Sequence, residues 1–499
     1  MTATKAQRIT PRAQDFSEWY NDVIMQAALA DYSPVRGCMV IRPHGFRLWE
    51  LMQHALDDMF KVTGHENAYF PLFIPQSFLA REAEHIEGFA KEVALVTHTR
   101  LKATGKPGAQ AIAVDPESEL EEPLVVRPTS ETIIYAMFSK WIQSYRDLPL
   151  LLNQWCNVVR WELRTRLFLR TTEFLWQEGH TAHATEEEAE AEARQMLAVY
   201  RRFQGEWMAM PVLTGRKTES EKFAGALRTY AVEALMQDNK ALQAGTSHNL
   251  GQNFAKAFNV QYQTAGGGLE FVWNTSWGVS TRMIGGLIMT HSDDNGFVCP
   301  PKLAPVQVVV VPIWKSDEER DAVLRCATRV RNELKQAGVR VTLDDRVELK
   351  PGAKYFEWEA KGVPLRLEIG PRDVAAGQVV AARRTGGKAP LKLEDIAPRT
   401  QAALNEIQAL LFKTALDRRE ANSRRGLSKA EFLAFMKQGG GFAYGGFCGS
   451  ASCEAEIKQA TAATIRVLPD AEFRSPVPPK SCMWCGAPSI AEAVWAQAY

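Results

Sequence analysis

The sequence contains no run of apolar residues long enough to span a membrane. No stretch approaches the ~20 consecutive apolar residues that a transmembrane helix requires. The first ten residues, MTATKAQRIT, are polar and lack the apolar centre of a secretory signal. Hydrophobic residues make up 46% of the chain and charged residues 23%, values that are ordinary for a globular protein. We therefore expect a cytoplasmic protein with no membrane contact.

The chain also has almost no net charge. Its 59 basic and 58 acidic residues leave a formal charge of +1, which argues against a strongly basic nucleic-acid-binding protein. Local basic patches can still bind phosphates when acidic helices balance the total. One such helix is expected after Thr185, because Glu188 completes a capping box ahead of the acidic run 186–192. We interpret this run as a solvated helix without a functional role.

Cysteine is scarce and unevenly distributed. Four of the eight cysteines stand alone and are interpreted as buried thiols. These isolated residues are Cys38, Cys156, Cys299 and Cys326. The other four form C-x4-C and C-x2-C pairs, namely Cys448, Cys453, Cys482 and Cys485. In a reducing compartment this spacing favours one structural zinc site over two disulfides, and unligated thiols are the alternative.

Neither a P-loop nor a G-x-G-x-x-G loop occurs, and no internal repeat is present. At 499 residues we expect two to four domains. Up to about residue 291, runs such as LLLNQWCNVV predict antiparallel strands without regular βαβ alternation. Helical spacing predicts an amphipathic helix over 46–60, ended by Gly64. Residues 102–122 are polar and predict a surface excursion.

After a predicted linker at 292–305 the pattern changes to βαβ alternation. The apolar run VQVVVVPI predicts a strand buried on both faces, and a helix is expected over about 317–337. The strands VRVTL and VPLRLEI then complete a small parallel or mixed α/β domain. Helices, a glycine cluster and the cysteine pairs follow, so the pattern predicts three domains.

Arginine and glutamate alternate in VVRWELRTRLFLRTTEFLWQEGH. A strand here would place Arg160 and Glu162 on the same face, with more arginines in the following connection. Two strands joined by arginines suit a bound polyanion, because a guanidinium group binds phosphate oxygens bidentately. A salt-bridged surface hairpin fits the same pattern, so these residues alone leave both interpretations open.

This segment resembles motif 2 of the class II aminoacyl-tRNA synthetases. NTSWGVSTRMIGGLIMTH is similar to motif 3, and the 46–60 helix with NAYFPLFIP is similar to motif 1. The resemblance implies that the antiparallel sheet binds ATP. It implies three catalytic residues: Arg160 on the α-phosphate and the amino-acid carboxylate, Glu162 on the adenylate, and Arg282 on the γ-phosphate. It also implies a homodimer with Pro71 at the interface.

Three further segments indicate the amino acid. VRPTSET, EFLWQEGH and QAGTSHNLGQNF resemble prolyl-tRNA synthetases of the archaeal and eukaryotic-like type with a C-terminal zinc-binding domain. The implied partners are L-proline, ATP, Mg2+ and tRNA-Pro. The implied proline-binding residues are Thr129, Glu131, Arg160, Phe174, Trp176 and His248. The implied ATP-binding residues are Arg160, Glu162, Thr171, Thr172, Gln243, Thr246, Ser280 and Arg282, with Gln243 also a candidate Mg2+ ligand.

The resemblance covers nearly the whole chain and implies three domains. They are an α+β catalytic domain on an antiparallel sheet (1–298), an α/β anticodon-binding domain (299–405) and a small α/β zinc-binding domain (406–499). Candidate anticodon contacts are Arg346, Lys350, Lys354, Lys361 and Arg372. Bacterial-type relatives carry an editing insertion between motifs 2 and 3, and residues 180–275 leave no room for one. Editing in cis is therefore not expected.

The C-terminal tail and a pair of histidines carry two further expectations. The tail AVWAQAY is apolar, so Trp495 and Tyr499 are expected to dock on the protein, and the resemblance implies that the Tyr499 carboxylate reaches toward the active site. His180 and His183, spaced H-x-x-H, are interpreted as packed residues and not as a metal site. A catalytically dead paralogue and an adenylate-forming ligase without tRNA remain as alternative functions.

Overall fold

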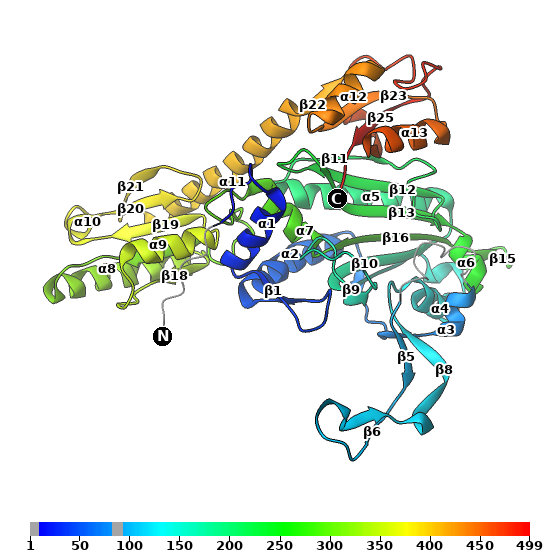
Figure 1. Cartoon of the computed structure of the whole chain (residues 1–499), viewed down its shortest axis with the longest axis horizontal. Coiled ribbons are helices and arrows are strands. Elements are labelled where there is room, and N and C mark those ends of the chain that lie inside the picture. Colours follow the sequence, from blue (N-terminus) through cyan, green and yellow to red (C-terminus); the bar gives the residue numbers. More distant parts are fainter. Residues whose placement is uncertain (1–8, 82–92) are drawn as a thin grey trace.

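The computed structural model describes residues 9–81 and 93–499 (Figure 1). Most of the polar N-terminal segment, on which the expectation of no secretory signal rests, lies outside these residues. Among the helices of the described residues, none combines the length and apolarity needed to cross a membrane.

An eleven-stranded sheet crosses the centre of the molecule. In order, its strands are β22 (Ser423–Arg425), β23 (Phe442–Phe447), β25 (Ala491–Ala496), β24 (Thr464–Pro469), β11 (Val212–Arg216), β12 (Arg228–Leu235), β13 (Ala241–Gly251), β16 (Trp273–Ser280), β10 (Glu173–His183), β9 (Leu150–Val159) and β3 (Glu66–Asn67). From β11 to β9 every neighbouring pair is antiparallel, which confirms the predicted sheet.

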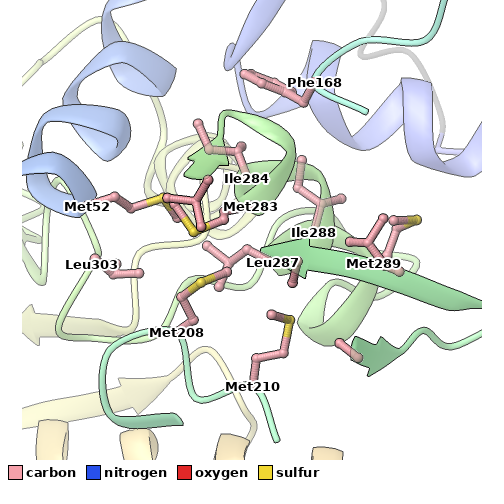
Figure 2. Close-up of a cluster of buried hydrophobic side chains, with 14 of the residues drawn as sticks. Met52, Phe168, Met208, Met210, Met283, Ile284, Leu287, Ile288, Met289 and Leu303 are labelled. Atoms are coloured by element: carbon pink, nitrogen blue, oxygen red, sulfur yellow. The ribbon is translucent and has the colours of Figure 1, made fainter. Parts of the chain in front are cut away.

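Helices α1 (Phe16–Gln26), α2 (Pro43–Val62), α5 (Glu186–Glu206) and α7 (Arg282–His291) contribute to the core beside this sheet. The predicted 46–60 helix is α2, and Gly64 follows it in the left-handed region, with φ +89°. Trp49, Met52 and Leu56 are buried as expected, but Phe46 is exposed, because it lies at the edge of the apolar stripe. Methionines fill much of this core: Met52, Met208, Met210 and Met283 surround Leu287 (Figure 2).

The acidic helix differs from its interpretation as a solvated element. Thr185 caps α5 through the Glu188 N–H, as predicted. One face of α5 nevertheless packs on β13 and β16, and Glu192 is buried with its carboxylate 2.9 Å from Nε2 of His65. The correction has a simple reason: most acidic residues of the run lie in the first turn or on the outer face, while Ala189, Ala193, Met196 and other small or apolar residues form most of the inner face.

The predicted excursion is exposed but not irregular. It contains a hairpin of β6 (Leu101–Ala103) and β7 (Ile112–Val114), which projects from the molecule (Figure 1). The excursion ends within β8 (Glu119–Val126). This strand is the middle one of a three-stranded sheet, between β4 (Phe73–Pro75) and β5 (Leu95–His98). The run NAYFPLFIP lies at sheet edges, as its prolines predict. The remaining short elements of this part are β1 (Ala30–Tyr32), β2 (Met39–Ile41), α3 (Gln76–Arg81), α4 (Glu131–Trp141), α6 (Asn253–Phe258), β14 (Gln261–Gln263) and β15 (Leu269–Phe271).

The α/β unit has the predicted mixed sheet. Its strands run in the order β18 (Val341–Leu343), β17 (Val308–Pro312), β19 (Leu365–Ile369), β20 (Gln378–Arg383) and β21 (Lys388–Lys392). The first three are parallel and the last two antiparallel. Helices α8 (Asp317–Gln336), α9 (Pro351–Ala360) and α10 (Pro371–Ala375) belong to the same unit. The expected linker before it is irregular, but Cys299 and Leu303 are buried in the central core.

A long helix, α11 (Ile396–Ala421), leads from this unit to the C-terminal unit (Figure 1). The C-terminal unit contains α12 (Lys429–Lys437), α13 (Ala451–Thr461) and β22 to β25. Its strand β24 pairs with β11, through Gly215 opposite Pro469 and Arg216 opposite Leu468. A Cβ on Gly215 would lie 2.2 Å from the Leu468 carbonyl oxygen, so only glycine permits this approach. The central sheet therefore continues into the C-terminal unit.

Candidate functional site

A cavity of about 320 Å³ opens on the central sheet. Side chains of β10, β13 and β16 line it, together with the beginning of α4 and the connection between β11 and β12. It brings together most of the residues singled out in the sequence: Thr129, Glu131, Arg160, Phe174, Trp176, Gln243, Thr246, His248, Ser280 and Arg282. Residues more than 120 positions apart thus converge on one site.

Arg160 occupies the predicted site but not the predicted strand. The strand β9 ends at Val159, so the expected placement of Arg160 and Glu162 within a strand is wrong. The Arg160 N–H still donates to the Thr172 carbonyl at 2.8 Å, after which the chain leaves the ladder. Its Nε donates to the Pro128 carbonyl at 3.0 Å.

Two aromatic rings lie beside the Arg160 guanidinium. Its central carbon lies 5.5 Å from the ring centroid of Phe174 and 5.2 Å from that of Trp176. Burial lowers the pKa of Arg160 to about 10, and nearby Glu131 opposes this shift. The side chain therefore remains a cation at neutral pH, and the rings and backbone fix its direction.

A carboxylate cluster faces the cavity at the start of α4. Ligand atoms of Glu131, Glu178 and His180 all lie within 4.8 Å of one another. The Glu178 oxygens accept from the Ser130 N–H at 3.2 Å, from Gln154 at 2.9 Å and from His180 at 3.0 Å. Burial raises the pKa of Glu178, but these hydrogen bonds outweigh it and hold the pKa below its usual value.

Glu131 is the second carboxylate of this cluster. It accepts a hydrogen bond from the Thr129 hydroxyl. A carboxylate has about four acceptor positions, and protein donors already occupy those of Glu178. Glu131 is therefore the carboxylate better placed to bind a cation in the cavity.

His248 is held as a neutral ring. Its Nδ1 lies 2.9 Å from the Thr229 hydroxyl and its Nε2 lies 3.0 Å from the Thr246 hydroxyl. Burial lowers the pKa of His248 to about 3, with a smaller contribution from His180. The Phe223 ring centroid lies 5.2 Å from that of His248. This part of the cavity is thus uncharged and flat.

The opposite part of the cavity is cationic. Arg282 is the first residue of α7, and its Nε donates to the Leu169 carbonyl at 3.1 Å. Burial lowers the pKa of Arg282, as does the charge of Arg170. The Ser280 hydroxyl accepts from the Arg282 N–H at 3.2 Å. A buried arginine beside the start of a helix is an environment that favours anions.

Three predicted residues do not line the cavity, namely Glu162, Thr171 and Thr172. Glu162 lies 3.7 Å from the Arg170 guanidinium, within the connection after β9. The Thr171 hydroxyl donates to the Glu173 carbonyl at 2.7 Å. The predicted contacts of these residues with ATP stay predictions.

Several lining residues were missed in the sequence: Glu178, Lys217, Glu221, Lys222, Phe223 and Thr229. Residues 217–223 are mostly polar, and nothing local in their sequence marks them as part of a site. Glu178 lies in EFLWQEGH, four residues after Phe174 and two after Trp176. Strand alternation from Trp176 would have placed it on the cavity face.

Two of the isolated cysteines also differ from their interpretation. Cys299 and Cys326 are buried, but Cys38 and Cys156 are only partly buried. The Cys156 sulfur accepts a hydrogen bond from Trp176 Nε1 at 3.2 Å and itself donates to Glu178 at 3.4 Å. Burial raises the pKa of the Cys156 thiol, as does the charge of Glu178. Cys156 therefore braces the cavity wall as a neutral thiol.

The clustered cysteines meet in the C-terminal unit. The sulfurs of Cys448 and Cys453 are 3.6 Å apart, and those of Cys448 and Cys485 are 3.7 Å apart. All four sulfurs, including that of Cys482, lie within 4.8 Å of one another. Tetrahedral zinc with Zn–S bonds of about 2.3 Å requires sulfurs about 3.8 Å apart. The donor set therefore fits one tetrahedral zinc ion.

The basic residues predicted for anticodon contact are not equivalent. Lys354 is 3% exposed and donates to the Asp344 carbonyl, so its assignment to a tRNA contact is wrong. It faces the core side of α9, which helical spacing alone did not reveal. Arg346 forms ion pairs with Asp344 and Glu357.

The other basic candidates are more accessible. Lys361 is half-buried and pairs with Glu357. Lys350 and Arg372 are exposed. A role of these residues in anticodon binding stays a prediction.

The C-terminal tail docks as predicted. Trp495 is buried, and the Tyr499 hydroxyl donates to Asp238 at 2.6 Å. The Arg166 guanidinium carbon lies 5.5 Å from the Tyr499 ring centroid. These contacts fix the ring of Tyr499, and a role of its carboxylate in the active site stays a prediction.

Three family descriptions match successive parts of the chain. Residues 114–291 match the tRNA synthetase class II core domain (G, H, P, S and T). Residues 307–402 match the anticodon binding domain, and residues 430–499 match the prolyl-tRNA synthetase C-terminal domain.

Curated relatives resemble the chain over its full length. It is 56% identical to a proline–tRNA ligase of Chlorobium phaeobacteroides over 500 residues, covering 99% of this chain and 100% of the relative. It is 54% identical to a proline–tRNA ligase of Porphyromonas gingivalis over 498 residues, covering 100% of both. A proline–tRNA ligase of Amoebophilus asiaticus is 53% identical over 494 residues, covering 99% of this chain and 100% of the relative. With the core, anticodon-binding and C-terminal domains all present, the chain belongs to the proline–tRNA ligase family of class II aminoacyl-tRNA synthetases.

Proposed function

We propose that this chain activates L-proline with ATP to give prolyl-adenylate, and then transfers the prolyl group to the 3′ end of tRNA-Pro. The observation that carries this proposal is the composition of the cavity. One part offers a carboxylate, an arginine and flat neutral rings, and the other offers cations around Arg282. Proline has a secondary ammonium, a carboxylate and a compact apolar ring, and each group finds a complementary partner.

The proposed proline contacts follow from this arrangement. Glu131 and Thr129 receive the ammonium group, and Arg160 binds the carboxylate. Phe174 and Trp176 contact each other edge to face beside Arg160, so the same rings that direct the guanidinium are proposed to form an apolar wall for the ring of proline. His248 closes the pocket as a neutral group, which avoids repulsion of the ammonium.

The proposed chemistry depends on electrostatic positioning. The proline carboxylate attacks the α-phosphorus of ATP, and pyrophosphate leaves. Arg160 contacts both reacting groups and Arg282 binds the γ-phosphate, so these preorganised cations stabilise charge that develops between them. Glu162, Thr171, Thr172, Gln243, Thr246 and Ser280 are the remaining proposed ATP contacts. The ribose hydroxyl of tRNA-Pro then attacks the adenylate carbonyl, and AMP leaves.

The proposal includes two metal ions, Mg2+ in the cavity and zinc in the C-terminal unit. Gln243 is the candidate side chain for Mg2+, because its amide oxygen suits a hard cation and it lines the cationic part of the cavity. Bound Mg2+ would neutralise phosphate charge. Cys448, Cys453, Cys482 and Cys485 are proposed to hold one structural zinc ion with no open coordination position.

The proposal divides the chain into a catalytic domain (1–298), an anticodon-binding domain (299–405) and a zinc-binding domain (406–499). The second boundary falls within α11. Between β10 and β16 the chain forms α5, β11 to β13, α6, β14 and β15. These elements belong to the central sheet or pack beside it, which supports the absence of a separate editing domain.

A homodimer is proposed through the surface around Pro71. Val62, Tyr69 and Phe73 near this residue are 87%, 73% and 43% exposed, which is unusual for apolar side chains. Light scattering of the purified protein would measure the assembly directly. The proposed location is the cytoplasm, where a cluster of thiolates stays reduced.

Pyrophosphate exchange with each of the twenty amino acids, with and without tRNA-Pro, tests the proposed function. We expect exchange with proline in the absence of tRNA, and charging of tRNA-Pro in a second assay. A chain without exchange would be a catalytically inactive paralogue. A chain that exchanges but never charges tRNA-Pro would be an adenylate-forming ligase of another kind.

A further inference from the structure

Two side chains of the C-terminal unit reach the wall of the substrate cavity. The connection between β11 and β12 contains residues 217–223, called here the cavity segment. Four of its side chains line the cavity, namely Lys217, Glu221, Lys222 and Phe223. The cavity segment begins directly after the β11–β24 pairing, where the C-terminal unit joins the central sheet.

Arg466 of β24 forms the first contact. Its Nε and Nη2 each donate to one oxygen of the Glu233 carboxylate, both at 3.0 Å. Lys217 donates to the same carboxylate at 3.0 Å. Glu233 is 0% exposed, Lys217 3% and Arg466 8%, so solvent does not screen these charges. Loss of Arg466 would leave Lys217 as the remaining cation on this carboxylate.

Glu454 of α13 forms the second contact. Its carboxylate accepts hydrogen bonds from the Thr218 hydroxyl at 3.0 Å and from the Ser220 hydroxyl. Both donors belong to the cavity segment. Glu454 follows Cys453, one of the four clustered cysteines, directly in the chain. The same turn of helix therefore carries a candidate zinc ligand and a contact to the cavity wall.

The cavity segment connects the two parts of the cavity. Glu233 lies opposite Gln243 in the β12–β13 ladder, so the two side chains share a face. At the other end, the Phe223 N–H donates to the Thr229 hydroxyl at 3.0 Å, and the Phe223 ring lies beside His248. Displacement of the segment would disturb both parts.

We propose that Arg466 and Glu454 are positioning residues for proline activation. They act through the cavity segment: Arg466 fixes Glu233 and thereby holds Lys217 in the cavity wall, and Glu454 holds the segment so that Phe223 packs against His248. The C-terminal unit is then part of the substrate site, although no residue of the unit lines the cavity described above. This inference rests on the proposed assignment of the cavity to proline and ATP.

The test uses the full-length protein and pyrophosphate exchange, with KM measured separately for ATP and proline. We expect Arg466→Met to raise KM for ATP at least tenfold, and Arg466→Lys to recover part of the loss because it keeps one charged contact. Glu454→Ala is expected to raise KM for proline at least fivefold, with a smaller effect for Glu454→Gln. In each case kcat is expected to change less than threefold.

Matched controls come from the same unit. Arg425→Met removes an arginine that contacts Tyr444 and Ser475, and Glu456→Gln alters a carboxylate that contacts Trp484. Neither partner touches the cavity segment, so both controls should keep wild-type KM values. Zinc content and the thermal midpoint are measured for every variant.

The outcomes separate the two proposals. Wild-type KM values in Arg466→Met and Glu454→Ala, with only a lower thermal midpoint, would show that the contacts serve stability alone and would overturn the inference. If Arg466→Met fails to fold, Arg466→Lys and the two Glu454 variants decide the question in the same way. Absence of proline exchange in the wild-type protein would instead contradict the proposed function.

Discussion

Thr229 and His248 face each other across the β12–β13 ladder, with the Thr229 hydroxyl 2.9 Å from His248 Nδ1. Thr246 holds the other ring nitrogen, so two hydroxyls set the orientation of the ring without giving it a charge. The same Thr229 hydroxyl accepts the Phe223 N–H. One hydroxyl group thus orders two sides of the proposed proline pocket.

Thr229→Val should therefore weaken proline binding. The substitution keeps the side-chain shape but removes the hydrogen bond to His248 and leaves the Phe223 N–H without this acceptor, at a cost of about 1–3 kcal/mol. We expect KM for proline to rise about tenfold or more, with KM for ATP nearly unchanged. Thr290→Val is the matched control, because Thr290 is equally buried but bonds within α7. Equal effects of the two substitutions would contradict a role for Thr229 in the pocket.

Arg160→Ala and Arg282→Ala should each abolish measurable pyrophosphate exchange. Loss of one preorganised charge at a transition state costs about 100- to 1,000-fold in rate, and Arg160 is proposed to serve two reacting groups. Circular dichroism and tRNA affinity should stay close to wild type, because neither side chain is proposed to contact tRNA. Arg329→Ala, at an exposed arginine of α8, provides the control. Near-normal exchange in Arg160→Ala would refute the proposed site.

Discrimination against smaller amino acids should be incomplete. An apolar pocket rejects a smaller side chain by only about 1–3 kcal/mol, and the proposal includes no editing domain. We expect cysteinyl- or alanyl-adenylate to form at high amino-acid concentration, and the mischarged tRNA-Pro to persist. Adenylate formation and deacylation of cysteinyl-tRNA-Pro measure the two steps. Rapid deacylation by this chain alone would show that it carries an editing activity.

Freshly purified protein should contain one equivalent of zinc. Cys482→Ser removes one of the four ligands and should reduce the content below half an equivalent, while Cys326→Ser should not. Structural zinc contributes on the order of 10 kcal/mol to the folding of its domain, so a chelator should lower the thermal midpoint of the C-terminal unit. Wild-type protein with less than half an equivalent would contradict the zinc site.

His291 should make the protein less stable in mild acid. Burial lowers its pKa to about 4, and Nε2 donates to the Met208 carbonyl at 2.9 Å. In the unfolded chain His291 has a pKa near 6.5. Between pH 6.5 and 4 it therefore binds a proton that the folded protein does not bind. Stability therefore falls by up to about 1.4 kcal/mol per pH unit as the pH decreases through this window.

His291→Gln removes this contribution while it keeps a donor for Met208. The difference in thermal midpoint between the wild type and this variant should become smaller from pH 7.5 to pH 5.0. His248 titrates in the same direction in both proteins, so it does not affect the comparison. A difference that is independent of pH would contradict the assignment.

The sequence predicted the elements and residues whose signals are local. The amphipathic stripe located α2, and the spacing of the cysteines predicted the cluster that the structure brings together. Arg160 was found by its motif, but its strand was extended too far, because alternation continues after Val159 while the backbone leaves the ladder. Sequence periodicity records side-chain direction and not the hydrogen bonds that define a strand.

What the sequence did not predict depends on distant contacts. Lys217 lies in a polar stretch and has no local feature that separates it from a surface lysine. It is buried because Glu233 from β12 accepts its hydrogen bond, and Arg466 from β24 holds the same carboxylate in place. Lys354 is the opposite case. It lies in a segment that was predicted to contact tRNA, but its side chain donates to Asp344 inside the α/β unit. Both cases require the fold before the role can be assigned.

The β11–β24 pairing also affects how the chain is made. During synthesis, β11 emerges long before β24, and until β24 is made its outer edge has no partner at Gly215 and Arg216. An unpaired strand edge is a template for association with other chains. We expect nascent or truncated chains that lack β24 to depend on chaperones, whereas the folded protein protects this edge with its C-terminal unit.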